Sequence, residues 1–392
     1  MGRMFSRRTG WDLEANALSG RLASARASGR PLLDLSEANP TRCGLAWGAD
    51  EISSLLADPR LGSYEPAPAG RLEAREAVSG YLAGRGIRVS PERVILTAST
   101  SEAYGMLLKL LCNPGEEVLF PAPCYPLLEL LASLEAVELG RYPVGWGGGW
   151  ELDLGALASA VGPRTRAVVA VHPSVPGGAA ARAGEIELLG QLCAERGLAL
   201  LLDEVFAESA PSPLPAASAG PALAFHLSGL SKVAGLPQVK AAWMAVAGPD
   251  ELAAEAVLRL EVIADSYLSI STQAELALPR LLARRDRFLV PLRDRLSRNR
   301  EALARAVPAA APFDASAGPA GWTAVLRLGE TVDEERLCLD LLEDGLVVQP
   351  GFFYDFGRNG HLVLSLLPEP AVFDEGISRL FSRLAPLHGP NG

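Results

Sequence analysis

Residues 227–237 read Leu-Ser-Gly-Leu-Ser-Lys-Val-Ala-Gly-Leu-Pro and end an apolar run that begins at residue 222. The apolar run is typical of a buried strand, and the Ser, Gly and Pro residues after it are typical of a turn. Lys232 is therefore expected just beyond a strand end, partly removed from water. A lysine that forms an imine with an aldehyde needs this setting, because desolvation lowers the pKa of its amine. Alone, the tripeptide Leu-Ser-Lys more often marks a solvated surface lysine, so the upstream sequence must decide between the two.

The chain upstream of this turn alternates between strand and helix patterns. Apolar runs that we expect to form strands lie at residues 94–97, 117–120, 167–171 and 198–202. Because these runs are apolar throughout, they predict a mainly parallel sheet that helices cover on both faces. Ligands bind to such sheets beyond the carboxyl ends of the strands. Asp203 stands at one of these ends and Lys232 follows another, which favours a shared site.

Residues beyond 308 predict a smaller α+β unit. Its expected strands lie at residues 323–328, 346–349 and 361–366, and its expected helices at 333–343 and 371–384. The predicted fold class is therefore α/β, with a large domain at residues 48–290. We assign residues 1–47 plus 291–392 to the small domain.

Composition excludes several classes of function. The 392 residues are 49% hydrophobic, enough for a large core, but no run reaches the roughly 18 apolar residues of a membrane span. The net charge of −10 and the lack of a basic run argue against a nucleic-acid partner. The five scattered cysteines and four dispersed histidines show no metal-ligand spacing. The basic residues 1–8 precede a polar stretch rather than an apolar signal segment, so we expect a cytoplasmic protein.

Two polar stretches are candidate ligand sites. The strand at residues 94–97 runs into Ala98-Ser99-Thr100-Ser101 and then into a helix. A strand, a hydroxyl-rich turn and a helix start together favour an anion, although the same hydroxyls also cap helices. The loop at residues 36–41, which contains Asn39, is expected either to line a substrate or simply to connect two elements.

Several short motifs occur in a fixed order over nearly the whole chain: Tyr64 with Gly70, the turn 97–101, Pro123-Cys124-Tyr125-Pro126, Asp203-Glu204-Val205-Phe206, residues 228–232, and Val348-Gln349-Pro350-Gly351. In this order they resemble the motifs of the class I/II aminotransferases, which are pyridoxal-phosphate enzymes of fold type I. The resemblance implies a seven-stranded type of sheet sandwiched by helices, with the smaller domain packed beside it. It also implies pyridoxal 5′-phosphate as the cofactor and a homodimer with shared active sites.

The resemblance assigns roles to individual residues. Lys232 would form the Schiff base and later carry the proton between substrate and cofactor, and Asp203 would pair with the pyridinium nitrogen. Tyr125 would stack on the cofactor ring. The phosphate would be held by Ser99, Thr100, Ser228 or Ser231, by Lys240 in place of the usual arginine, and by Tyr64 from the neighbouring subunit. Asn39 is the candidate contact to substrate.

Three positions depart from the family pattern. Val175 stands where the family has an asparagine, and Phe206 where it has a tyrosine, so both usual donors to the phenolic oxygen of the cofactor are missing. Val363 stands where the family has the arginine that binds the substrate carboxylate. Losing that contact should remove about 2–5 kcal/mol of binding for an ordinary α-amino acid. Arg358 or His361 are candidate replacements.

The sequence therefore predicts a pyridoxal-phosphate-dependent aminotransferase that acts on an amino donor and a keto acid, with atypical carboxylate recognition. Two alternatives stay open at this point. One is a lyase or decarboxylase on the same fold, because Lys232 and Asp203 serve these reactions equally. The other is a degenerate homologue without catalysis that acts as a binding protein.

Overall fold

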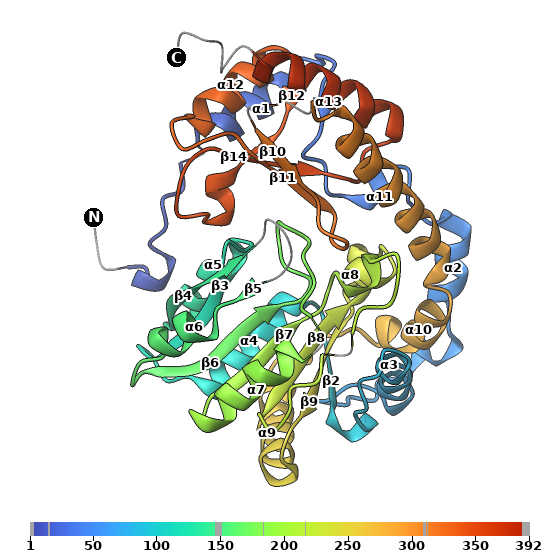
Figure 1. Cartoon of the computed structure of the whole chain (residues 1–392). Helices are drawn as coiled ribbons and strands as arrows, with labels where there is room; N and C mark the ends of the chain where they lie inside the picture. Colours follow the sequence, from blue (N-terminus) through green and yellow to red (C-terminus); the bar gives the residue numbers. More distant parts are fainter. Residues whose placement is uncertain are drawn as a thin grey trace.

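The computed structural model describes residues 4–14, 16–145, 151–182, 184–215, 217–308, 311 and 313–385. Within these ranges, eight strands form a central sheet in the order β2-β9-β8-β7-β6-β3-β4-β5 (Figure 1). The strands are β2 (Val94–Thr97), β3 (Glu117–Ala122), β4 (Glu138–Gly145), β5 (Glu151–Leu152), β6 (Thr165–Val171), β7 (Ala199–Asp203), β8 (Ala224–Gly229) and β9 (Ala242–Ala247). Strands β8, β7, β6, β3 and β4 run parallel to one another. The outer strands are antiparallel: β9 to both β8 and β2, and β5 to β4. The predicted α/β class is confirmed, and the short β5 adds one strand to the predicted seven.

Helices cover both faces of this sheet, as its uniformly apolar strands require. One face packs against α4 (Thr100–Leu111), α5 (Leu127–Glu135) and α9 (Asp250–Asp265), and the opposite face packs against α6 (Leu154–Ala160) and α7 (Glu185–Glu195). Successive residues of β6 alternate between the two cores: Val169 faces α4, whereas Val168 and Ala170 face α7. A third core, around β2 and β9, is closed by α2 (Ala49–Leu56), α3 (Leu72–Gly84) and α10 (Thr272–Ala283).

A second, antiparallel sheet carries the C-terminal part of the chain. Its order is β10 (Asp314–Ser316), β11 (Thr323–Arg327), β14 (His361–Ser365) and β13 (Gln349–Pro350). It packs against helices α11 (Asp286–Ala306), α12 (Glu334–Glu343) and α13 (Pro370–Leu384), as Figure 1 shows. None of the helices in the described part of the chain is long and apolar enough to cross a membrane.

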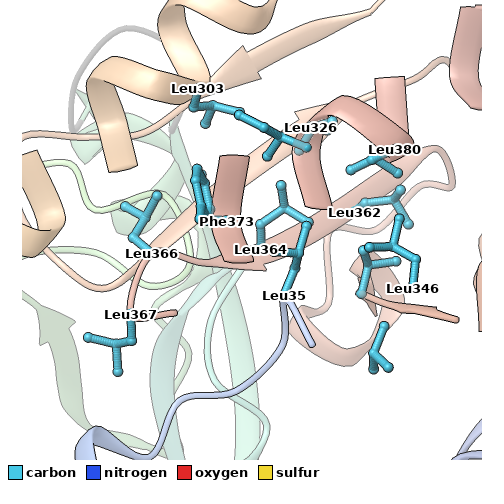
Figure 2. Packing of buried hydrophobic residues seen from close by; sticks show 14 of the residues in the cluster. Leu35, Leu303, Leu326, Leu346, Leu362, Leu364, Leu366, Leu367, Phe373 and Leu380 are labelled. Carbon is cyan, nitrogen blue, oxygen red and sulfur yellow. The ribbon is translucent and has the colours of Figure 1, made fainter. Parts of the chain in front are cut away.

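The N-terminal segment joins this C-terminal unit. Strand β1 (Leu33–Asp34) pairs in parallel with β12 (Leu346–Val347), and α1 (Ala17–Ala27) lies beside α12. Leu35, just after β1, is fully buried among Leu362 and Leu364 of β14 and Phe373 of α13 (Figure 2). This packing accords with grouping residues 1–47 with residues 291–392, although the domain limits themselves stay predictions.

One edge of the central sheet gathers several strand ends. In the register, Thr97 of β2 lies opposite Ala242, which lies opposite Gly229 of β8. Asp203 of β7 lies between Leu227 and Val171. The short helix α8 (Leu230–Val233) follows β8 at this edge and lies beneath β11 of the second sheet (Figure 1). The edge therefore faces the C-terminal unit.

Candidate active site

Asp203 and Lys232 lie together at this edge, as the sequence predicted. Asp203 is the last residue of β7, and Lys232 lies in α8 immediately beyond the adjacent strand β8. Burial raises the pKa of Asp203 to about 6. Burial also lowers the pKa of Lys232 to about 8, although the charge of Asp203 opposes this shift. Near neutral pH a useful fraction of the Lys232 amine is therefore uncharged and able to act as a nucleophile.

Two hydrogen bonds orient the carboxylate of Asp203. The backbone N–H of Val205 donates to Oδ1 at 3.2 Å, and the phenol of Tyr104 donates to Oδ2 at 2.9 Å. Both contacts act against the rise in the Asp203 pKa that burial causes. Tyr104 was not among the predicted site residues. It lies one helical turn beyond Thr100 in α4, but this spacing alone does not distinguish it from an ordinary core residue of the helix.

The start of α4 provides anion-binding groups. Ser99 caps the helix, since its Oγ accepts from the Glu102 N–H at 3.1 Å, while Glu102 Oε2 accepts from the Ala98 N–H at 2.7 Å. The N–H groups of Thr100 and Ser101 have no acceptor among the described residues, as is usual for the first residues of a helix. Ser101 was not predicted as a site residue, although it belongs to the same turn.

A buried hydroxyl at the end of β8 also lacks a partner. Ser228 is almost fully buried, and its Oγ makes no hydrogen bond within the described ranges. Ser231, next to Lys232 in α8, is partly exposed. Free helix amides and an unpaired buried hydroxyl are what a phosphate group needs, so these residues fit the phosphate of the predicted cofactor.

The remaining predicted residues lie in loops. Tyr64 is 78% exposed and Tyr125 is 54% exposed. Lys240 is exposed and holds a left-handed backbone conformation (φ 59°), which lysine rarely adopts. Asn39 caps a short 3₁₀ helix, because its Oδ1 accepts from the N–H and the hydroxyl of Thr41. The cofactor and substrate roles of these four residues stay predictions.

Two aromatic rings surround the amine of Lys232. Its Nζ lies 4.4 Å from the ring centroid of Trp322 and 5.3 Å from that of Phe206. The two rings contact each other edge to face, with centroids 5.4 Å apart. Trp322 was not predicted as a site residue; it directly precedes β11 and reaches the lysine from the second sheet.

The position of the missing arginine is apolar. Val363 of β14 is fully buried and lies opposite Val325 of β11. These two valines form a cluster with Tyr354, and Val175 from the loop after β6 packs against it. Of the candidate replacements, Arg358 pairs with Glu330 at 3.2 Å, and His361 stacks on Phe356 with centroids 4.2 Å apart.

A buried ionic network supports the backbone behind Asp203. Glu204 accepts from Arg85 Nη2 at 2.7 Å, and its other oxygen lies 2.7 Å from Nδ1 of His226. Burial raises the pKa of Glu204, but the Arg85 charge and the His226 contact outweigh it and bring the pKa down to about 2. Glu204 is therefore ionised and fixed in place, which holds the end of β7 rigidly.

A family model for aminotransferase class I and II matches residues 33–380. The chain belongs to this family. Class I and II aminotransferases depend on pyridoxal phosphate, and the Lys232–Asp203 pair with its anion-binding turn fits that cofactor. The predicted family, fold and cofactor are thus confirmed.

Curated aminotransferases resemble the chain over much of its length. Alanine aminotransferase of Mycobacterium tuberculosis is 29% identical over 373 residues, which cover 91% of this chain and 86% of that protein. Nicotianamine aminotransferase 1 of rice (Oryza sativa) is 26% identical over 253 residues, or 62% of this chain and 50% of that protein. The chain therefore spans most of the mycobacterial enzyme but only half the length of the rice enzyme.

Solved aminotransferase structures have the same fold. An aminotransferase from Escherichia coli superposes with a TM-score of 0.86 at 21% identity, covering 98% of both chains. A mutant of the aspartate aminotransferase from Thermus thermophilus superposes with a TM-score of 0.84 at 23% identity, covering 98% of this chain and all of that one.

Proposed function

We propose that the chain transfers an amino group between an amino donor and a keto acid, with pyridoxal phosphate bound covalently through Lys232. The observation that carries this proposal is the placement of Lys232 beside Asp203 at the carboxyl ends of adjacent parallel strands. When bound, the cofactor supplies an electron sink that stabilises a carbanion at the substrate carbon.

Asp203, supported by Tyr104, would help the cofactor ring to accept electrons from the substrate. The Asp203 carboxylate would hold the ring nitrogen of the cofactor and keep it protonated. The hydrogen bonds from Tyr104 and Val205 favour the charged carboxylate, so they support this pairing in a buried site. Lys232 Nζ would take a proton from the substrate carbon and later return one.

The phosphate is proposed to bind at the start of α4. The amides of Thr100 and Ser101, the cap residue Ser99 and the hydroxyls of Ser228 and Ser231 supply donors. Lys240 supplies a positive charge but not the bidentate fork of an arginine. Tyr125 is proposed to stack on the cofactor ring.

Substrate recognition is proposed to differ from that of an enzyme with an arginine at position 363. The buried apolar cluster of Val363, Val325 and Tyr354 provides no charged group at this position. We therefore propose that the amino donor is not held by a bidentate carboxylate contact at this position, and that Asn39 contributes a polar contact.

We also propose that the chain works as a homodimer in the cytoplasm. Tyr64 is 78% exposed in its own chain, which leaves its phenol available to a neighbouring subunit. Residues 48–290 are proposed as the large domain, and residues 1–47 plus 291–392 as the small domain.

A spectral screen tests the proposed function. Purified protein is loaded with pyridoxal phosphate and mixed with a panel of α-amino acids, including alanine and glutamate, and plain amines. Conversion of the cofactor to its amino form by at least one donor, and reversal by a keto acid, is the expected result. Release of ammonia and keto acid without that conversion would instead identify a lyase, and loss of carbon dioxide a decarboxylase.

The Lys232→Ala variant is the control for this screen. It should lose the visible absorbance of the bound cofactor and all conversion. If the wild-type protein acquires no visible band that depends on Lys232, the enzymatic proposal fails and a binding protein is left.

A further inference from the structure

An unpaired hydrogen-bond donor lies beside the reactive lysine. Trp322 is 3% exposed, and its Nε1 has no acceptor among the residues that the structure describes. A buried N–H group without a partner has lost its hydrogen bonds to water without gaining another, which destabilises the fold. What distinguishes the Trp322 N–H from other unpaired buried donors is its place beside the proposed cofactor site, where a bound group is able to supply the acceptor.

The indole ring is held firmly in this position. Its edge-to-face contacts with Phe206 and Phe288 have centroid distances of 5.4 and 6.3 Å. The preceding residue, Gly321, donates its N–H to Ser209 Oγ at 2.7 Å and accepts from Arg300 Nη2 at 2.9 Å. The backbone and the ring are therefore both fixed, and the N–H cannot easily turn toward another acceptor.

The chemistry of pyridoxal phosphate supplies an acceptor at this place. The cofactor has an ionised phenolic oxygen on the ring carbon next to the one that bears the aldehyde. When the aldehyde carbon is bonded to Lys232 Nζ and the ring nitrogen faces Asp203, that oxygen must lie near Nζ. A buried oxygen anion requires a donor.

The side chains that the structure records around the lysine amine differ in their ability to donate to this oxygen. The two rings around Nζ are those of Phe206 and Trp322, and Phe206 has no polar atom. The loop after β6 contributes Val175, whose side chain packs in apolar surroundings. Trp322 therefore combines an unused donor with a ring centroid 4.4 Å from the amine.

We propose that the indole N–H of Trp322 donates a hydrogen bond to the phenolic oxygen of bound pyridoxal phosphate. This inference rests on the proposed function and names a cofactor contact that is particular to this chain. The hydrogen bond stabilises the negative charge on the oxygen. The oxygen then holds the proton that it shares with the lysine nitrogen less tightly, so this proton is lost at a lower pH.

The test is a pH titration of the visible absorbance band of the lysine-bound cofactor in the wild type and in Trp322→Phe. The variant keeps an aromatic ring but loses the N–H. Its titration midpoint should lie about one to two pH units above that of the wild type, because a hydrogen bond to a charged group is lost. A midpoint equal to that of the wild type overturns the proposal.

Trp243→Phe is the matched control. Trp243 is also fully buried, and its Nε1 also lacks an acceptor within the described ranges, but its ring packs against Tyr81. Its midpoint should equal that of the wild type. An equal shift in both variants would show a general effect of lost packing and would overturn the assignment to Trp322.

A second measurement observes the Trp322 N–H directly by NMR in the wild-type protein. The chain has six tryptophans, and ¹⁵N-indole labelling gives one NMR signal for each, assigned through single Trp→Phe variants and elimination. Pyridoxal phosphate alone should move the Trp322 N–H signal downfield. A signal that moves only when an amino donor is added would assign the N–H to substrate and overturn the proposal.

The absorbance experiment separates failure of this inference from failure of the proposed function. Absence of a Lys232-dependent band in wild-type protein would overturn both, whereas a normal band with an unshifted Trp322→Phe midpoint overturns this inference alone.

Discussion

At the level of single residues, the site depends on two charges that are each held away from their ordinary state. Burial disfavours the ammonium form of Lys232 and the carboxylate form of Asp203, and each charge partly restores the other. The net result for Lys232 is a pKa of about 8, which is close to neutral pH. A nucleophile with such a pKa combines a usable neutral fraction with good reactivity.

The rate at which Lys232 captures added pyridoxal phosphate should depend on pH through this pKa. The neutral amine reacts, so the rate should rise about tenfold per pH unit below pH 8 and level off above it. Stopped-flow absorbance on cofactor-free protein at constant ionic strength measures the profile. In Asp203→Asn the midpoint should move to lower pH, because the charge that favours the ammonium is gone. A wild-type midpoint above pH 10, near that of a solvated lysine, would contradict this account.

Tyr104 should help to set the pKa of Asp203 through its hydrogen bond to the carboxylate. In Tyr104→Phe the carboxylate loses a donor at 2.9 Å, so the pKa of Asp203 should rise further and its pairing with the pyridinium nitrogen should weaken. We expect about a fivefold to tenfold loss of pyridoxal phosphate affinity, as one hydrogen bond to a charged group suggests. Fluorescence titration measures it.

The control for this loss of affinity is Tyr142→Phe. Tyr142 is also fully buried, but its phenol donates to the backbone oxygen of Val169 at 2.7 Å instead of to Asp203. Its replacement should lower stability without weakening cofactor binding. An equal loss of affinity in both variants would remove the special role of Tyr104.

The sequence predicted Lys232 and Asp203 because both follow apolar strands, and parallel strands end at one edge of a sheet. It did not predict Tyr104 or Trp322. Tyr104 looks like an ordinary core residue of α4, and only the packing of that helix on the sheet shows that its hydroxyl meets Asp203. Trp322 lies just before β11, about ninety residues after Lys232 in the chain, and no local pattern encodes the meeting of two distant segments.

At the level of elements, the end of β2 is joined to α4 through a turn that presents backbone donors. The capping box of Ser99 and Glu102 fixes the start of α4 while leaving the next two amides free. The hydroxyl-rich turn at residues 97–101 was recognisable because capping and anion binding use the same residue types. The fold class and the alternation of strands and helices were equally recognisable, whereas the two-residue β5 pairs too briefly to leave a pattern.

Replacing Ser228 with alanine should affect the folding stability of the protein and its affinity for pyridoxal phosphate differently. Its buried hydroxyl has no partner in the described structure, so Ser228→Ala should leave the stability of cofactor-free protein unchanged or raise it by about 1 kcal/mol. Affinity for pyridoxal phosphate should fall about fivefold, because one phosphate donor is lost. Urea unfolding and cofactor titration measure the two effects.

Ser79→Ala is the matched control for Ser228→Ala. Ser79 lies in α3, and its hydroxyl already donates to the backbone oxygen of Val89 at 2.6 Å. Its removal should therefore cost about 1 kcal/mol of stability and leave cofactor affinity unchanged. A clear loss of stability in Ser228→Ala without loss of affinity would assign Ser228 to the core rather than to the phosphate site.

At the level of the whole molecule, the active-site edge is closed from above by the C-terminal unit. Trp322, Val325 and Val363 come from that unit, whereas Lys232 and Asp203 come from the central sheet. Substrate chemistry is therefore expected to depend on how the two parts approach each other. The apolar contact of Val175 with the Val363 cluster depends on this approach and was not predicted from the sequence.

Tyr64 tests the proposed shared site of a dimer. Tyr64→Phe should weaken pyridoxal phosphate binding about tenfold or more, the effect of a lost hydrogen bond to a charged phosphate. Hybrid dimers of Tyr64→Phe and Lys232→Ala subunits should regain sites with wild-type affinity, because one site then receives Lys232 from one subunit and Tyr64 from the other. Equilibrium binding after mixing and refolding measures the recovery. No recovery in verified hybrids would place Tyr64 in the site of its own subunit.

The central claim is a covalent bond between Lys232 and the aldehyde of pyridoxal phosphate. Protein loaded with the cofactor is reduced with borohydride, digested and mapped by mass spectrometry. The account predicts the mass of a reduced pyridoxyl phosphate group on the peptide that contains Lys232, and none in Lys232→Ala. A label on another lysine, with Lys232 unmodified, would contradict it.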